Sequence, residues 1–147
     1  MSHNENGLRL IKLRADLNLT SSPDNIKILL RSGEHGLFTI FKNQLERPVG
    51  YLTWAGINKE SFRRLLDFNE NLKYPYEWNE GRIALITDVA LEKSCRQVLR
   101  THIRESLRNK RLVVFRRNGA IRVYTRTHRG FRLVLKKAAF SGRPQAA

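Results

Sequence analysis

Cysteine, long apolar runs and late acidic residues are what this sequence has least of. A single cysteine, Cys95, excludes an internal disulfide framework and is compatible with a reducing cytoplasm. No apolar run approaches the ~18 residues of a membrane-spanning helix, and the polar start MSHNENGLRL lacks a signal peptide's apolar segment. One cysteine and four scattered histidines give no zinc-ligand spacing. We therefore expect a cytoplasmic protein without a membrane span or a metal site.

The shortage of acids is confined to the C-terminal third. Residues 1–92 hold 12 of the 13 acidic residues and 12 of the 28 basic ones, so their charges cancel. Residues 93–147 hold the other 16 basic residues and one acid, Glu105, so the whole net charge of +15 lies there. Such asymmetry indicates an acidic partner: nucleic acid, an anionic membrane or an acidic protein. The alternative is that these charges only keep a surface soluble.

The 147 residues suit a single domain, with flexible ends expected at 1–20 and 139–147. Ser22 and Pro23 predict the start of a helix that stops at Gly33. Residues 36–42 and 47–57 read as an antiparallel hairpin. A short helix is expected over 58–68, a loop over 69–81, and a buried strand over 82–91.

The rest of the chain alternates between helix and strand patterns. Residues 92–109 have helical periodicity, with an apolar stripe beside a basic one. Asn118-Gly119 predicts a two-residue hairpin turn, and residues 131–137 add another strand. The order of helix, hairpin, helix, strand, helix and hairpin predicts an α/β (α+β) domain. Its central sheet is mixed or antiparallel and is flanked by helices.

Three blocks of sequence resemble the bacterial RTX toxin-activating lysine acyltransferases. That family has a Pro-Val-small-Tyr run followed two residues later by Trp-Ala, and the segment RPVGYLTWA supplies it here. About thirty residues on, the family has a Trp, a Gly and then a strand with an Asp seven residues after the Gly. The segment EWNEGRIALITDVAL supplies Trp78, Gly81 and Asp88 at that spacing. A basic helix and a basic strand pair follow, so the resemblance covers roughly residues 34–130.

The resemblance implies a fold like that of the GNAT acyltransferases and a specific reaction. These enzymes take a fatty acyl chain from acyl carrier protein and pass it to lysines of a protoxin in the cytoplasm. No tightly bound cofactor is implied, because the acyl carrier protein is the donor substrate. The stretch EKSCRQV has no glycine where the superfamily's coenzyme A turn would lie. Tyr51, Trp54 and Trp78 are implied as scaffold and pocket wall.

Family catalysis is assigned to a histidine near the N-terminus and an aspartate on the central strand, and Asp88 matches the aspartate. A carboxylate on an apolar strand must be paired or hydrogen-bonded, so it could orient a histidine, or be a structural acid that binds backbone amides or an arginine. Asn25 stands where the histidine would fall if SSPDN is aligned. Anchoring on the hairpin instead gives residues 14–17, which also lack one. His35 is the remaining candidate base, with a plain surface role as its alternative.

The basic helix fits an acidic carrier protein, which a ridge of cations could steer and hold. The residues of that ridge are Lys93, Arg96, Arg100 and Arg104. Three interpretations stay open: a divergent acyltransferase, a non-catalytic binding module of the same fold, and a nucleic-acid-binding domain. The last interpretation uses a strand face with Arg122, Tyr124, Arg126 and His128. Pairing of exposed sheet edges could also give a homodimer.

Overall fold

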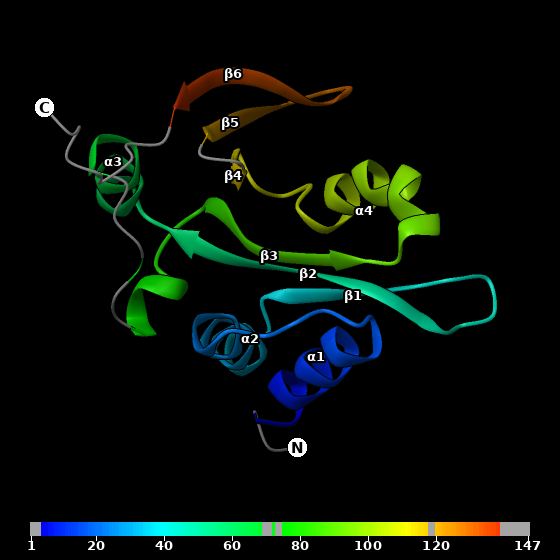
Figure 1. Ribbon diagram of the computed structural model, residues 1–147. Coiled ribbons are helices and arrows are strands. Elements are labelled where there is room, and N and C mark those ends of the chain that lie inside the picture. The colour runs from blue at the N-terminus through cyan, green and yellow to red at the C-terminus, as the bar shows by residue number, and fades with distance from the viewer. Residues whose placement is uncertain (1–3, 69–71, 73–74, 118–119, 139–147) are drawn as a thin grey trace, which may run out of the picture.

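The computed structural model describes residues 4–68, 72, 75–117 and 120–138. Within them the chain forms four α-helices, two short 3-10 helices and one six-stranded sheet (Figure 1). The predicted mixed α/β class is confirmed. None of the helices in the described residues is long and apolar enough to cross a membrane. In chain order the elements are α1 (Asn4–Asp16), α2 (Pro23–His35), β1 (Phe38–Lys42), β2 (Pro48–Ile57), α3 (Lys59–Phe68), η1 (Pro75–Trp78), β3 (Ile83–Leu91), η2 (Lys93–Val98), α4 (Leu99–Ser106), β4 (Leu112–Arg117), β5 (Ala120–Thr127) and β6 (Gly130–Ala138).

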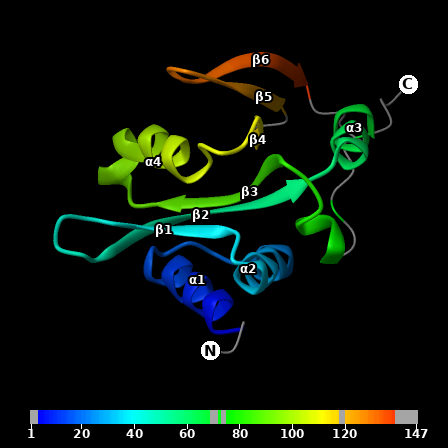
Figure 2. The same cartoon turned by 180° about the vertical axis from the view of Figure 1, so that it is seen from behind.

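The strands lie in the sheet in the same order as in the chain, from β1 to β6. All neighbours are antiparallel except β3 and β4, whose parallel ladder runs only from Ile83 and Leu112 to Leu85 and Val114. Beyond Leu85 the two strands diverge. Figures 1 and 2 show α4 seated where β1–β3 and β4–β6 part. The crossover through η2 and α4 makes a parallel pair possible, because parallel neighbours cannot be joined by a tight turn.

Helices cover both faces of the sheet. On one face α1 and α2 pack Leu10, Leu13 and Leu29 against Tyr51 of β2 and Ala90 of β3. On the other face, apolar residues of η2 and α4 cover a cluster from β2, β3 and β4, which includes Leu52, Trp54, Ile86 and Val113. A third cluster, around Leu65 of α3, packs against Ile57 and Leu85. The central strands β2 and β3 are therefore buried on both sides, as their apolar sequences predict.

Helix α1 corrects the expectation that residues 1–20 are flexible. Leu10 is fully buried and Leu13 nearly so, which anchors the helix on the sheet. The contact with α2 depends on two glycines: a Cβ on Gly33 would lie 2.3 Å from the Gly7 nitrogen. The sequence does not predict this helix, because its buried face is narrow and its other face is strongly polar.

Helix α2 begins as predicted and ends later. The Ser22 hydroxyl accepts a hydrogen bond from the Asn25 amide, and the Asn25 side-chain oxygen accepts one from the Ser22 amide. Both hydrogen bonds of a capping box are therefore present. Gly33 does not stop the helix, because it serves the contact with α1. The cap is Gly36, whose φ of 68° favours glycine. His35 is consequently the last residue of α2.

The predicted helix over 92–109 is divided. Its first part, η2, is a 3-10 helix, and only Leu99–Ser106 is α-helical. Glu92 makes no side-chain cap hydrogen bond, and the Cys95 amide donates to the Glu92 carbonyl at 2.9 Å in the tighter 3-10 pattern. The predicted Asn118-Gly119 turn and the tail 139–147 lie outside the described residues. The strands on either side of that turn pair antiparallel as expected, with Arg117 opposite Ala120.

Replacing Gly33 tests the glycine contact. We expect Gly33→Ala to lower the free energy of unfolding by about 1–3 kcal/mol, because the added methyl group forces α1 away from α2. Urea denaturation followed by circular dichroism measures this. The control is Lys27→Ala at an exposed position of α2, which should stay within about 0.5 kcal/mol of the parent. Equal effects of the two substitutions would contradict the packing argument.

Candidate active site

A β-bulge in β3 aims the candidate acid at α1. Thr53 pairs with Asp88 and Trp54 with Ile86, so Thr87 is an extra residue between two rungs of the ladder. A bulge turns neighbouring side chains toward one face. The Thr87 hydroxyl thereby reaches the Thr53 hydroxyl at 2.8 Å, and the Asp88 carboxylate reaches Tyr51. The bulge therefore places two consecutive polar side chains on the face covered by α1 and α2.

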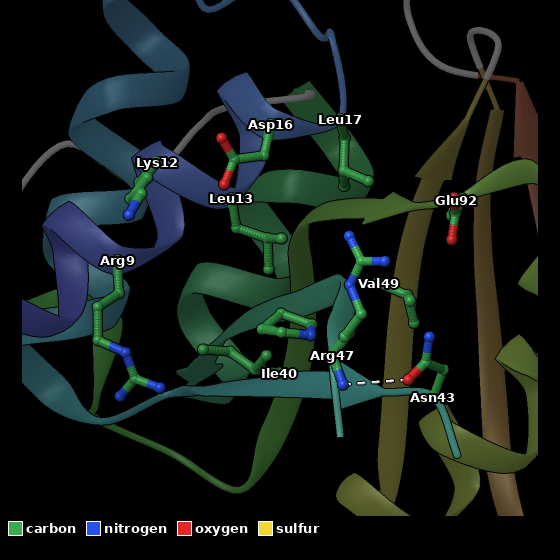
Figure 3. Close-up of a pocket in the computed structure, with 11 residues that line it drawn as sticks. Arg9, Lys12, Leu13, Asp16, Leu17, Ile40, Asn43, Arg47, Val49 and Glu92 are labelled. Atoms are coloured by element: carbon green, nitrogen blue, oxygen red, sulfur yellow. Dashed lines mark hydrogen bonds between the residues drawn. The ribbon is translucent and has the colours of Figure 1, made fainter. Parts of the chain in front are cut away.

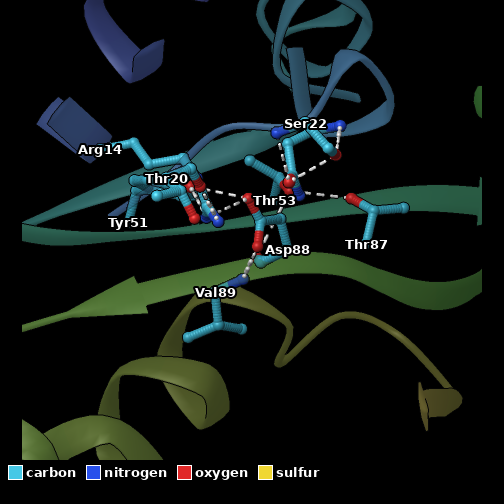
Figure 4. Close-up of polar contacts among 9 residues, drawn as sticks. Arg14, Thr20, Ser22, Tyr51, Thr53, Thr87, Asp88 and Val89 are labelled. Atoms are coloured by element: carbon cyan, nitrogen blue, oxygen red, sulfur yellow. Dashed lines mark hydrogen bonds and ion pairs between the residues drawn. The ribbon is translucent and has the colours of Figure 1, made fainter. Parts of the chain in front are cut away.

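The Asp88 carboxylate has three hydrogen-bond donors (Figure 4). The Tyr51 hydroxyl donates to Oδ2 at 2.7 Å, and Arg14 Nη1 donates to the same oxygen at 3.2 Å. The Val89 amide donates to Oδ1 at 2.9 Å. A carboxylate has about four acceptor positions, so one remains, on Oδ1. The Asp88 side chain is 12% exposed, so it is not completely sealed from solvent.

Arg14 connects α1 to the central strand. Its Nη1 donates to both Asp88 and the Tyr51 hydroxyl, the latter at 3.1 Å. Its Nε and Nη2 donate to the Thr20 carbonyl at 3.0 and 2.8 Å. The loop after α1 thus fixes the orientation of the guanidinium that pairs with the carboxylate. With 13% of the side chain exposed, Arg14 and Asp88 form a mostly buried ion pair.

Tyr51 is fully buried and stays a neutral donor. Burial raises the pKa of its hydroxyl well above the usual range, and the hydrogen bond to Asp88 raises the pKa further. Arg14 acts in the opposite direction but is a smaller influence. The phenol therefore keeps its proton and holds the carboxylate oxygen in place.

His35 does not stand at this site as a partner of Asp88. Among the described residues, no histidine shares a hydrogen bond with the carboxylate. His35 is half-buried at the end of α2, and its Nε2 has no hydrogen-bond partner in the described part of the chain. The residue that meets Asp88 is Arg14, from the stretch 14–17 where alignment on the hairpin places the family's histidine. The sequence allows an arginine as a structural partner of Asp88, but it does not identify Arg14 as that arginine.

The three aromatic residues implied as pocket wall do not lie together. Tyr51 belongs to the cluster under α1 and α2, Trp54 to the cluster under α4, and Trp78 packs beside the cluster around α3. Tyr51 and Trp54 point to opposite faces because side chains alternate along a strand. Only Tyr51 therefore contributes to the surroundings of Asp88, and the two tryptophans are scaffold.

A groove of about 550 Å³ lies between α1 and the β1–β2 hairpin (Figure 3). Its volume is within the range of small-molecule sites. Leu13 and Leu17, which line it, flank Arg14 in the sequence, so α1 both forms the groove wall and binds Asp88. The other lining residues combine an apolar surface with charges of both signs: Arg9, Lys12, Asp16, Ile40, Asn43, Arg47, Pro48, Val49 and Glu92.

The predicted basic ridge is exposed as expected, despite the division of the helix. Residues three apart are aligned in the 3-10 helix, and residues four apart are neighbours in the α-helix, so the cations stay on one side. Its members are Lys93, Arg96, Arg100 and Arg104. On the face proposed for nucleic acid, Tyr124 packs against the core cluster under α4. Part of the ring is therefore occupied by the core, and part remains exposed.

Comparison with models of known protein families finds no match, and a search of curated proteins finds no matching sequence.

The buried tyrosine predicts a loss of stability at high pH. Its folded-state pKa lies above the unfolded value of about 10, so its contribution is complete below pH ~10 and is lost above it. We expect the free energy of unfolding to fall more steeply above pH ~10 in the parent than in Tyr51→Phe. Urea titrations across this range measure the difference. Parallel pH profiles would contradict a protonated, buried Tyr51.

The ion pair predicts strong coupling between its two members. Asp88→Asn should cost roughly 3 kcal/mol of unfolding free energy, because it leaves a mostly buried guanidinium without its carboxylate. The double variant Arg14→Met/Asp88→Asn should lose much less than the sum of the single losses. The matched control is the surface pair Arg31–Glu34, whose coupling should stay near or below about 0.5 kcal/mol. Equal couplings in the two cycles would show that Arg14 and Asp88 do not act as a buried pair.

Proposed function

We propose that the protein is a divergent lysine acyltransferase. It transfers a fatty acyl group from acyl carrier protein to a lysine of a partner protein in the cytoplasm. The observation that carries this proposal is Asp88: an acid on the central strand, turned by a bulge, fixed by Tyr51 and Arg14, and left with one acceptor position. The resemblance to the toxin-activating acyltransferases, which names the same residue, supports the same function.

The chemistry requires a neutral amine at a thioester. The acceptor's lysine ammonium donates a hydrogen bond to Oδ1 of Asp88 and gives up a proton there. The amine nitrogen then attacks the thioester carbonyl carbon, and the carbon–sulfur bond breaks. The carrier's sulfur leaves as a thiolate, which takes up the second proton lost by the nitrogen, and Asp88 returns the first proton to solvent. The products are an amide on lysine and a free carrier thiol. Tyr51 and Arg14 keep the carboxylate oriented and do not react.

Two surfaces suit the two macromolecular substrates. The exposed ridge of Lys93, Arg96, Arg100 and Arg104 fits the acidic carrier protein, and its charges would accelerate the encounter at low salt. The groove beside α1 has apolar walls and carries both Arg47 and Glu92. It fits a segment of the acceptor next to its target lysine. Asp88 itself is not among the residues that line the groove, so the lysine must extend beyond the groove to reach it.

A second candidate is a non-catalytic module of the same fold that binds a carrier or another protein. The observation that favours it is the Arg14–Asp88 pair itself. Arg14 already supplies the positive charge that an imidazolium or the acceptor's ammonium would otherwise bring to the carboxylate. In this candidate Asp88 fixes α1 to the sheet and has no role in proton transfer.

One experiment separates the two candidates. The protein is incubated with fatty-acyl carrier protein and a lysine-bearing acceptor, and intact-protein mass spectrometry follows the acceptor. The acyltransferase adds the mass of the fatty chain, and the adduct survives hydroxylamine because an amide, unlike a thioester, resists it. Asp88→Asn should lower the rate by about 10²-fold or more.

The control variant is Asp24→Asn, an exposed acid in the first turn of α2, which should keep the parental rate. No transfer, together with retained carrier binding, would reject the acyltransferase and leave the binding module. Tighter, strongly salt-dependent binding to single-stranded nucleic acid than to the carrier would reject both.

A further inference from the structure

A second hollow, of about 330 Å³, lies between the end of α4 and the turn that joins β5 to β6. Four arginines and one histidine line it, with three uncharged residues from the turn. Only Arg104 is shared with the basic ridge. The lining residues are Arg104, Arg108, Arg126, Thr127, His128, Arg129, Gly130 and Phe131.

Within the described part of the chain, the cations of this hollow have no carboxylate partner. The described residues provide no ion pair to any of its arginines, and none of its lining residues is acidic. The single acid after residue 92, Glu105, is absent from the lining. Four guanidiniums around one small space repel each other unless an anion enters it.

The walls of the hollow are held in place by local contacts. Arg126 Nη1 donates to the Arg108 carbonyl, which ties β5 to the segment after α4. The Thr127 hydroxyl donates to the Gly130 carbonyl at 3.2 Å and accepts from the Arg129 amide at 3.3 Å, which fixes the turn. Gly130 has a φ of 128°, and a Cβ there would lie 2.7 Å from Arg104 Nε. Because Gly130 has no side chain, the Arg104 guanidinium can lie close to the turn.

We propose that this hollow binds a phosphate group. The planar guanidinium fork matches the oxygens of a phosphate, and charge-assisted hydrogen bonds to it are the strong ones. The hollow is small and ends at the tight turn between β5 and β6, so it fits one discrete phosphate better than a polymer. The phosphate comes from a free phosphorylated molecule or from the prosthetic arm of a carrier protein. The second source rests on the proposed function.

Titration with inorganic phosphate tests the site without any carrier. Amide chemical shifts are followed by NMR at constant ionic strength set with chloride. We expect saturable shifts concentrated in residues 127–131. The variant Arg108→Gln/Arg129→Gln should weaken binding by about tenfold or more, because both side chains are exposed cations of the hollow.

The matched control is Arg96→Gln/Arg100→Gln, which removes the same charge from the ridge outside the hollow. It should change phosphate binding by less than about twofold. An equal loss in both variants, or shifts spread over the surface without saturation, would overturn the proposal. Circular dichroism of both variants establishes that they are folded.

Comparison of carrier proteins with and without the phosphorylated arm identifies the source. If the arm supplies the phosphate, only the arm-bearing carrier loses affinity in the hollow variant. If both carriers bind alike while inorganic phosphate binds saturably, a free phosphorylated molecule is the source. If the parent protein binds inorganic phosphate saturably but binds neither carrier, the proposed function is rejected and the phosphate site is retained.

Discussion

The ion pair between Arg14 and Asp88 joins the N-terminal helix to the middle of the sheet. It links residues far apart in the chain through a mostly buried contact, and Tyr51 completes it from the neighbouring strand. Two charges out of water are tolerated only when their hydrogen bonds are satisfied. The Thr20 carbonyl, the Val89 amide and the Tyr51 phenol satisfy them here. The position of α1, and hence the shape of the groove beside it, depends on this arrangement.

The bulge at Thr87 and the divergence of β3 from β4 give one strand two different tasks. In its first part β3 is a core strand, paired on both sides. In its second part it presents Asp88 toward α1, while its other face still packs under α4. A regular strand would turn either Thr87 or Asp88 to the opposite face. The extra residue is therefore what makes a polar site compatible with an otherwise apolar strand.

The sequence predicted elements whose signals are local. The Ser22 cap, the apolar run of β3 and the alternation of β5 each depend on neighbouring residues, and the structure confirms them. It predicted Asp88 as a polar residue in need of partners but not the partner, because Arg14 is brought there only by tertiary packing. The same holds for Gly33, whose contact with Gly7 depends on how two helices cross. Local sequence does not reveal that contact, so it predicts Gly33 as the end of the helix. The bulge leaves no pattern in the sequence, since it is defined by register with β2.

The sequential order of the strands carries the uneven charge of the chain directly into space. Because β1 to β6 lie side by side in chain order, β1–β3 of the charge-balanced part form one side of the sheet and the basic strands β4–β6 form the other. Of the helices before residue 92, α3 alone among the described ones reaches across, where the Leu66 carbonyl accepts a hydrogen bond from Lys137 of β6. A fold that interleaved early and late strands would have averaged this difference away. The result is a permanent electric dipole across the sheet. In the field of a polyanion it turns the molecule so that the α4 side arrives first and the α1 side faces away.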